Sequence, residues 1–233
     1  MQLENDFSSK SFKDKFKLDT LLSLNNIKSK YQPGDLDEQA IPAYLNPNPL
    51  AQWLFWQRIW VCVKHLPNTE NGKVLDFGCG SGILLPILNE KFKHVVGVDV
   101  VTEPALQHLK QMKEIGWKYD NINIYNDIKT TCISDDYFDF ILALDVLEHV
   151  ENLEELLKIL HSKLKKDGIL LISGPTENLL YKIGRLITGY SGHYHIRNIY
   201  DIRKSMQQLF NVTVVKKLVF PFNLFLILKA TKK

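Results

Sequence analysis

The sequence predicts an α/β fold, namely a doubly wound, mostly parallel sheet of seven strands with helices on both faces, a terminal antiparallel hairpin and an N-terminal helical cap. Short apolar runs alternate with helical segments between residues 73 and 173, which is typical of right-handed βαβ crossovers in a parallel sheet. Near the C-terminus two further apolar runs are separated by a few turn residues, too few for a parallel crossover. A glycine-rich stretch follows the first run, where a strand is expected to turn directly into a helix.

The composition agrees with an ordinary globular chain. The 233 residues include 29 basic and 26 acidic side chains, and the apolar share of 45% is too high for a disordered chain. Cys62, Cys79 and Cys132 form no CxxC pair, which argues against a zinc site or a disulfide framework and favours a reducing, cytoplasmic location. No secretory signal is visible at the start, and the longest apolar stretch, 218–228, is about half a membrane span.

The N-terminal quarter is less regular than the rest of the chain. Residues 1–30 are rich in lysine with weak helical periodicity, so they form either a loosely docked helix or a partly disordered arm. Residues 31–52 contain four prolines and predict irregular chain with turns. The apolar segment 53–66 predicts a buried helix that Pro67 ends. We therefore divide the chain into an N-terminal extension and helical cap, 1–66, and a ligand-binding domain, 67–233.

The remaining elements follow from hydrophobic periodicity and from capping residues. Thr102 predicts the N-cap of one helix, and Gly116 and Gly168 predict helix ends. Residues 174–200 break the alternation, and we expect this insert to cover the carboxyl edge of the sheet as a lid. The predicted strands are 73–77, 94–100, 121–127, 138–146, 168–173, 211–218 and 224–232, and the predicted helices are 82–92, 102–116, 151–168 and 201–210.

The stretch VLDFGCGSG at 74–82 is the most informative part of the sequence. Gly78, Gly80 and Gly82 lie in a strand-to-helix turn, where the absence of side chains lets backbone amides approach a ligand. A dinucleotide fingerprint requires a glycine at position 83, which is Ile83, and this disfavours an NAD-dependent oxidoreductase. A carboxylate at Asp76 suits a cationic or amine-bearing ligand better than a pyrophosphate.

Acidic residues end the next two predicted strands. Asp99 ends the second strand, where an acid is placed to accept hydrogen bonds from a ribose diol. Asp127 ends the third strand and could accept from an adenine amino group. Either acid alone could be a solvated loop residue, but acids at the carboxyl ends of consecutive strands indicate a nucleoside-bearing ligand.

These segments, with NDI at 126–128 and FDFILALDVLEHV at 138–150, resemble the first four motifs of the class I, seven-stranded α/β S-adenosylmethionine-dependent methyltransferases. The resemblance covers about residues 70–233 and is greatest to the small-molecule branch that includes ubiquinone-biosynthesis-type O-methyltransferases. It implies an enzyme that uses S-adenosyl-L-methionine and releases S-adenosyl-L-homocysteine. The turn 78–82 would wrap the methionine moiety, Asp99 would hold the ribose, and Asp127 with Ile128 would bracket the adenine. The cofactor-binding residues expected in this way are Asp76, Phe77, Gly78, Cys79, Gly80, Gly82, Asp99, Val100, Asp127, Ile128, Leu144 and Asp145.

A hydroxyl acceptor requires a general base in addition to the methyl donor. The candidate catalytic residues are His149, after the fourth strand, and His193 and His195 in the insert. His149 could instead only orient its loop, and Ile196 after His195 departs from the aromatic residue usual in the resembling family. We predict no metal site, because the histidine spacing matches no zinc pattern and alternate residues of an extended segment point in opposite directions.

The predicted cap and insert indicate the class of acceptor. The tryptophan-rich helix and the tyrosines of the insert would form an aromatic lid, which suits a small-molecule or lipid-like acceptor methylated at oxygen. Tryptophans in a buried helix are, however, more often core residues. A nucleic-acid acceptor is disfavoured by the scattered lysines, and a non-catalytic cofactor-binding partner or regulatory subunit with the same fold is the alternative. Peripheral membrane contact and the oligomeric state are left open. The lid residues are Trp53, Phe55, Trp56, Trp60, Tyr181, Tyr190 and Tyr194.

Overall fold

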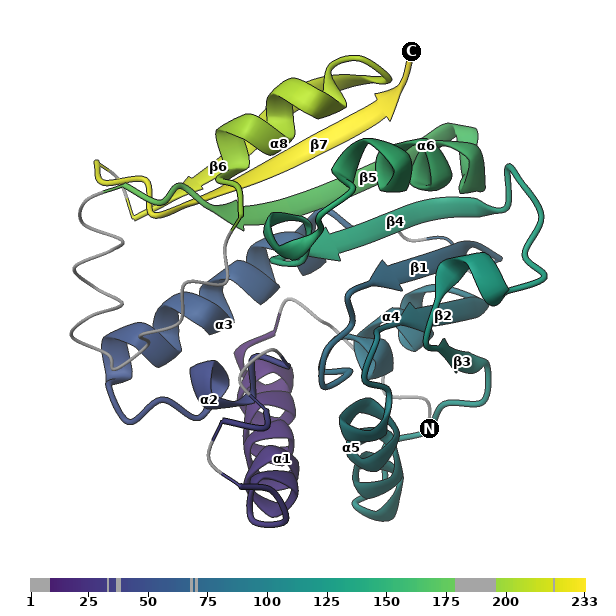
Figure 1. Ribbon diagram of the computed structural model, residues 1–233. Coiled ribbons are helices and arrows are strands. Elements are labelled where there is room, and N and C mark those ends of the chain that lie inside the picture. The colour runs from purple at the N-terminus through teal and green to yellow at the C-terminus, as the bar shows by residue number, and fades with distance from the viewer. Residues whose placement is uncertain are drawn as a thin grey trace.

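A computed structural model describes residues 9–32, 34–36, 39–67, 69, 71–178, 196–219 and 221–233. Its centre is a seven-stranded sheet in the order β3-β2-β1-β4-β5-β7-β6 (Figure 1). In this order the first five strands, from β3 to β5, are parallel to one another, whereas β7 runs antiparallel to both β5 and β6. The predicted fold class is therefore confirmed. The strands are β1 (Lys73–Phe77), β2 (His94–Val98), β3 (Ile122–Tyr125), β4 (Phe138–Leu144), β5 (Leu164–Pro175), β6 (Phe210–Leu218) and β7 (Phe225–Lys232).

Helices cover both faces of the sheet because neighbouring strand residues point to opposite sides. In β1, Val74 packs into one core and Leu75 into the other. The first face carries α1 (Lys10–Lys28), α3 (Pro49–Lys64), α4 (Leu85–Lys91) and α5 (Glu103–Glu114), and the second carries α6 (Leu153–Lys163) and α8 (Ile199–Met206) (Figure 1).

The largest difference from the predicted elements lies between α6 and β5. Periodicity predicts a helix to residue 168, but α6 ends at Lys163 and the strand begins at Leu164. Leu164 is fully buried opposite Phe138, and the register then jumps so that Phe140 pairs with Ile169. Pairing and burial at this position outweigh the helical pattern of the local sequence.

Several other boundaries shift by a few residues. Helix α3 begins at Pro49 rather than at residue 53, because the Asn48 side chain accepts hydrogen bonds from the first-turn amides of Leu50 and Ala51. Helix α5 starts after Thr102 as expected, although the Thr102 side chain makes no capping hydrogen bond. A four-residue helix, α2 (Ile41–Tyr44), lies within the stretch predicted to be irregular.

The N-terminal helix α1 is firmly packed rather than loosely docked. Its Phe16 is fully buried with an edge-on contact to Trp60, at a ring separation of 5.9 Å. On the α5 side, the buried Ser23 hydroxyl lies 2.8 Å from Nδ1 of His108, and burial lowers the pKa of His108 to about 3. The helix therefore joins the main core. Among the described residues, no helix is both long and apolar enough to cross a membrane.

Candidate functional site

The glycine-rich turn lies at the carboxyl edge of the sheet, where the arrowheads of the parallel strands converge (Figure 1). The backbone N–H groups of Gly78 and Cys79 both donate to the carbonyl of Val98, at 2.8 and 3.1 Å. The backbone at Gly78, Gly80 and Gly82 adopts positive φ angles of 72°, 53° and 72°. The end of β2 thus holds the turn that follows β1, and the three glycines adopt a backbone conformation that would be strained for other residues.

Neighbouring loops enclose the same turn. A Cβ atom at Gly78 would lie 2.3 Å from Cγ2 of Val146, the second residue after β4. A Cβ atom at Gly80 would lie 3.2 Å from the carbonyl oxygen of Gln39, in the N-terminal extension. At these two positions the neighbouring loops leave little room for a side chain, which is typical of a turn whose backbone forms a cradle for a closely bound ligand.

Asp99 connects the turn to the end of β2. Its Oδ2 accepts a hydrogen bond from the Gly80 amide at 2.7 Å, and its Oδ1 accepts one from the Val101 amide at 3.1 Å. An ionised carboxylate only accepts hydrogen bonds, which is the chemistry that a ribose diol requires of its partner. Val100, beside it, is 79% exposed, so the mouth of the site is open at this point.

Asp76 and Cys79 are both buried next to the turn. Burial, together with the negative charge of Asp99, raises the pKa of Asp76 to about 7. Burial also raises the pKa of the Cys79 thiol well above its ordinary value, and its Sγ lies 3.1 Å from the position of a Cβ at Gly97. Cys79 therefore presents its backbone to the turn while its sulfur packs against β2. Phe77, between them, is partly buried.

The end of β3 is more exposed. Asp127 is solvent-exposed, and its Oδ1 accepts a hydrogen bond from the Lys129 amide at 2.9 Å, which caps the short helix η1 (Ile128–Thr130). Ile128 is buried in the second core, so its side chain supports the loop from below. The two adjacent residues thus face opposite environments.

The end of β4 carries an ion pair that local sequence patterns did not reveal. Asp145, the first residue after β4, has a φ of 53° and pairs with Arg58 of α3. The Ser173 hydroxyl of β5 donates to Oδ1 of Asp145 at 2.8 Å. The backbone N–H of Asp145 donates to the carbonyl of Ser173 at 3.0 Å. The one sequence signal for this contact was a lone arginine in the otherwise apolar run WLFWQRIWVCV.

Arg58 is buried among polar and aromatic side chains. Its side chain is 3% exposed, and Nη2 donates to the hydroxyl of Tyr44 at 3.2 Å. The guanidinium carbon lies 5.0 Å from the centre of the Phe55 ring and 5.4 Å from that of Phe225. A buried arginine between aromatic rings is held in place, since both stacking and hydrogen bonds fix its plane.

Of the three candidate catalytic histidines, the structure describes only His149. It is exposed at the end of the short helix η2 (Leu147–His149), whereas His193 and His195 lie outside the described residues. The adjacent Glu148 is almost fully buried, and burial raises its pKa to about 7. Its Oε2 has no hydrogen-bond partner among the described residues. Sequence reasoning overlooked Glu148 as a proton acceptor because its burial is visible only in the folded chain.

The aromatic lid is only partly supported. Trp56 and Trp60 are 2% and 8% exposed and pack edge-on around Phe16, so the prediction that they form a lid is wrong and their role is in the core. Trp53 is 48% exposed. Phe55 stacks against Arg58 at the carboxyl edge. The tyrosines of the insert, Tyr181, Tyr190 and Tyr194, lie outside the described residues.

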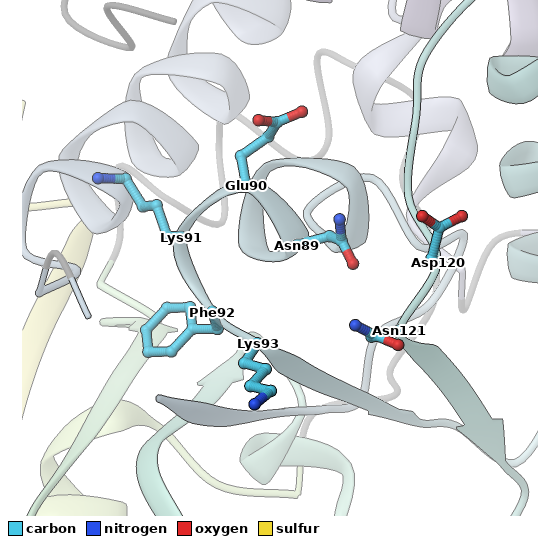
Figure 2. A pocket seen from close by; sticks show the side chains of 7 residues that line it. All are labelled: Asn89, Glu90, Lys91, Phe92, Lys93, Asp120 and Asn121. Atoms are coloured by element: carbon cyan, nitrogen blue, oxygen red, sulfur yellow. The ribbon is translucent and has the colours of Figure 1, made fainter. Parts of the chain in front are cut away.

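A separate polar hollow of about 250 Å³ lies at the opposite edge of the sheet, where β2 and β3 begin. Figure 2 shows that its side chains come from the end of α4 and from the residues that precede these two strands. It contains no part of the glycine turn. In the part of the chain that the structure describes, no three His, Cys, Asp or Glu side chains are grouped to hold a metal ion. The hollow is lined by Asn89, Glu90, Lys91, Phe92, Lys93, Asp120 and Asn121.

Comparisons with known proteins agree with this geometry. The family model described as "Methyltransferase domain" matches residues 57–214, more than half of the chain. A ubiquinone biosynthesis O-methyltransferase from Glaesserella parasuis is 36% identical over 105 residues, which is 43% of this chain and 44% of that relative. A probable (S)-tetrahydroprotoberberine N-methyltransferase from Papaver bracteatum is 33% identical over 101 residues, 42% of this chain and 28% of that relative. The chain thus matches less than half the length of these curated relatives.

Solved structures share the fold at low sequence identity. The N-methyltransferase NodS from Bradyrhizobium japonicum, solved with S-adenosyl-L-homocysteine, superposes with a TM-score of 0.60 at 15% identity and covers 92% of this chain and 98% of its own. A SAM-dependent methyltransferase from Aquifex aeolicus gives a TM-score of 0.58 at 16% identity and covers 86% and 98%. At these identities the likeness establishes the fold.

Proposed function

We propose that this chain, which belongs to the methyltransferase-domain family, is an S-adenosylmethionine-dependent methyltransferase that methylates an oxygen atom of a small-molecule or lipid-like acceptor. The observation that carries the oxygen assignment is the buried Glu148 beside His149 at the end of β4, because a hydroxyl acceptor needs a nearby group that takes its proton. Similarity to ubiquinone biosynthesis O-methyltransferases supports it.

In this proposal the β1–β2 end of the carboxyl edge holds the cofactor. The amides of the turn 78–82 approach the methionine moiety, Asp99 accepts from the ribose, and Asp127 with the backbone of Ile128 brackets the adenine. The chemistry of these groups fits: Asp99 is a carboxylate held at the turn by the amides of Gly80 and Val101, and Val100 beside it is exposed. Phe77 and Leu144, both partly buried at strand ends, complete the lining.

The protein's part in the reaction is then alignment and proton removal. S-adenosylmethionine supplies a methyl group on a positively charged sulfur, which is already a good leaving group. The fold orients the acceptor oxygen and excludes water from the transfer path. Glu148, whose pKa burial raises to about 7, is suited to accept the hydroxyl proton near neutral pH, and His149 is the second candidate.

Exposed apolar side chains at the same edge support a greasy acceptor. Leu50 and Trp53, in the first turns of α3, are 71% and 48% exposed, and Phe222, in the turn between β6 and β7, is 52% exposed. The start of α3 and this hairpin turn both lie on the side toward which the arrowheads of β4 and β5 point (Figure 1). Apolar surface beside a cofactor site suits a hydrophobic acceptor better than a strongly charged one.

Methyl transfer to a panel of acceptors tests the proposal. Wild-type protein is incubated with S-adenosylmethionine carrying a labelled methyl group and with phenols, catechols and long-chain alcohols, each beside the matched amine. Label recovered on oxygen supports the proposal, and label recovered only on nitrogen replaces it with the N-methyltransferase alternative that two of the relatives suggest.

Two variants then separate the candidate bases. Glu148→Gln keeps the size of the side chain but cannot take up a proton, whereas His149→Ala removes the imidazole. If Glu148 is the base, Glu148→Gln lowers kcat by about 10²- to 10⁴-fold with little change in cofactor affinity, and His149→Ala changes kcat much less. Full turnover in both variants would show that positioning alone carries the reaction.

A further inference from the structure

We propose that Arg58 is a positioning residue. Through its ion pair with Asp145, it holds in place the corner after β4, residues 145–146, where the Val146 side chain packs against the glycine turn. The inference rests on the proposed function in one respect, because it takes the turn to be the site of the methionine moiety. It assigns no direct contact between Arg58 and the cofactor.

The first step in the argument is the backbone at Asp145. Its φ of 53° lies in the left-handed region, which costs aspartate less than most residues but still needs surrounding contacts to hold it. Three contacts do so here: the ion pair with Arg58, the hydrogen bond from the Ser173 hydroxyl, and the backbone bond to the Ser173 carbonyl. Only the first of these comes from outside the sheet.

The second step links this corner to the turn. Val146 follows Asp145, and its Cγ2 lies 2.3 Å from the position of a Cβ on Gly78. The valine side chain therefore rests directly on the Gly78 backbone. A displacement of Asp145 moves Val146 and changes the shape of the turn, because packed side chains and backbone in contact move together.

The third step concerns Arg58 itself. The guanidinium is fixed by the Tyr44 hydroxyl and by the rings of Phe55 and Phe225, so it is a rigid partner for the carboxylate. Its positive charge also lowers the pKa of the nearby Glu148 against the larger effect of burial. When one partner of a buried ion pair is removed, the other is left as an uncompensated charge. Without Arg58, the Asp145 carboxylate is expected to turn toward water and to draw Val146 away from Gly78.

A rescue experiment tests this chain of contacts, with the dissociation constant of S-adenosyl-L-homocysteine measured by calorimetry and Tm measured alongside. Arg58→Met removes the charge and keeps the length of the side chain. Arg58→Lys keeps a positive charge opposite Asp145 and is the conservative variant that should restore part of the affinity. Ile59→Ala, at the adjacent buried position of α3, is the control for loss of packing alone.

We expect Arg58→Met to weaken binding about tenfold, which corresponds to 1.4 kcal/mol. Ile59→Ala is expected to lower Tm with unchanged affinity. Arg58→Lys keeps the charge but not the planar fork, so it is expected to bind between wild type and Arg58→Met.

Two results overturn the inference. Affinity of Arg58→Met within about twofold of wild type shows that the pair stabilises the fold only. Affinity of Arg58→Lys no better than that of Arg58→Met shows that the positive charge opposite Asp145 does not position the turn. If Arg58→Met does not fold, Arg58→Lys decides alone and must bind more weakly than wild type. Failure of the proposed function would appear separately, as no transfer to oxygen by wild-type protein.

Discussion

The two ends of the carboxyl edge are built from different kinds of contact. At the β1–β2 end, residues 76–101 supply the glycine turn, the acceptor Asp99 and the buried Asp76. Backbone amides donate most of the hydrogen bonds there. At the β4–β5 end, side chains from α2, α3, β5 and the β4 loop meet at Arg58 and Asp145. The difference teaches that contacts within a short stretch of sequence shape the first end, whereas the second depends on how distant segments are placed.

The most severe test of the β1–β2 end is Gly78→Ala. The new Cβ would collide with Val146, and the φ of 72° would be strained for alanine. Together, left-handed strain and overpacking cost about 3 kcal/mol or more, so we expect the dissociation constant of S-adenosyl-L-homocysteine to rise by more than about 100-fold.

Gly116→Ala is the matched control for that variant. Gly116 also has a positive φ, 105°, but a Cβ there would meet nothing within 4 Å, and it lies after α5, away from the turn. It should lower Tm and leave affinity unchanged. Near-normal affinity of Gly78→Ala would contradict the cradle described above.

Asp99→Ala is expected to have the next largest effect. It removes the acceptor for the Gly80 amide and the proposed partner of the ribose, and losing hydrogen bonds to a charged group costs about 1.5–3 kcal/mol, or roughly 10- to 100-fold in affinity. Asp139→Ala is the control, because Asp139 accepts from the amide of Lys73 at 2.8 Å at the other end of β1. A loss of affinity within about twofold for Asp99→Ala would refute the ribose assignment.

Cofactor affinity is also expected to depend on pH through Asp76. If the ionised carboxylate pairs with the amine of the methionine moiety, S-adenosyl-L-homocysteine binds more tightly as the pH rises through the pKa of about 7. Affinity should gain about tenfold between pH 6 and pH 8, as proton linkage requires, and the gain should vanish in Asp76→Asn. Glu148→Gln should keep it, which separates Asp76 from the other carboxyl group with a pKa of about 7.

The stability of the free protein should follow the opposite trend. The folded-state pKa of Asp76 is raised above its unfolded value of 3.8, so the neutral carboxyl group stabilises the fold fully below pH 3.8 and this contribution is lost as the pH rises through 7. Relative to wild type, Asp76→Asn should therefore gain Tm between pH 5 and pH 8. An equal Tm difference at both pH values would show that Asp76 titrates normally.

The smallest effect is expected at the β4–β5 end, for Ser173→Ala. The variant removes one of three contacts on Asp145 while the ion pair and the backbone bond remain. This hydrogen bond acts on Asp145 and not on the ligand, so affinity should fall by no more than about fivefold, or about 1 kcal/mol. Thr213→Ala, on the edge strand β6, is the control. A loss as large as that of Asp99→Ala would remove the distinction between the two ends.

Local reasoning placed the glycine turn after β1 and Asp99 at the end of β2, where the structure has them. It did not predict the hydrogen bond from the Gly80 amide to Asp99 or the pairing of Arg58 with Asp145. The α6–β5 boundary was misplaced because Leu164 fits a helical stripe as well as a strand, and only its pairing with Phe138 decides between them.

By itself the sequence determined the alternation of elements, the reversed final hairpin, the glycine turn and the acids at the strand ends, because hydrophobic period and turn chemistry act over a few neighbouring residues. Only the tertiary structure decided that Trp56 and Trp60 belong to the core, that Glu148 is buried, and that Arg58 meets Asp145. Burial and ion pairing join residues far apart in the chain, and no local pattern records which distant side chain will be the neighbour.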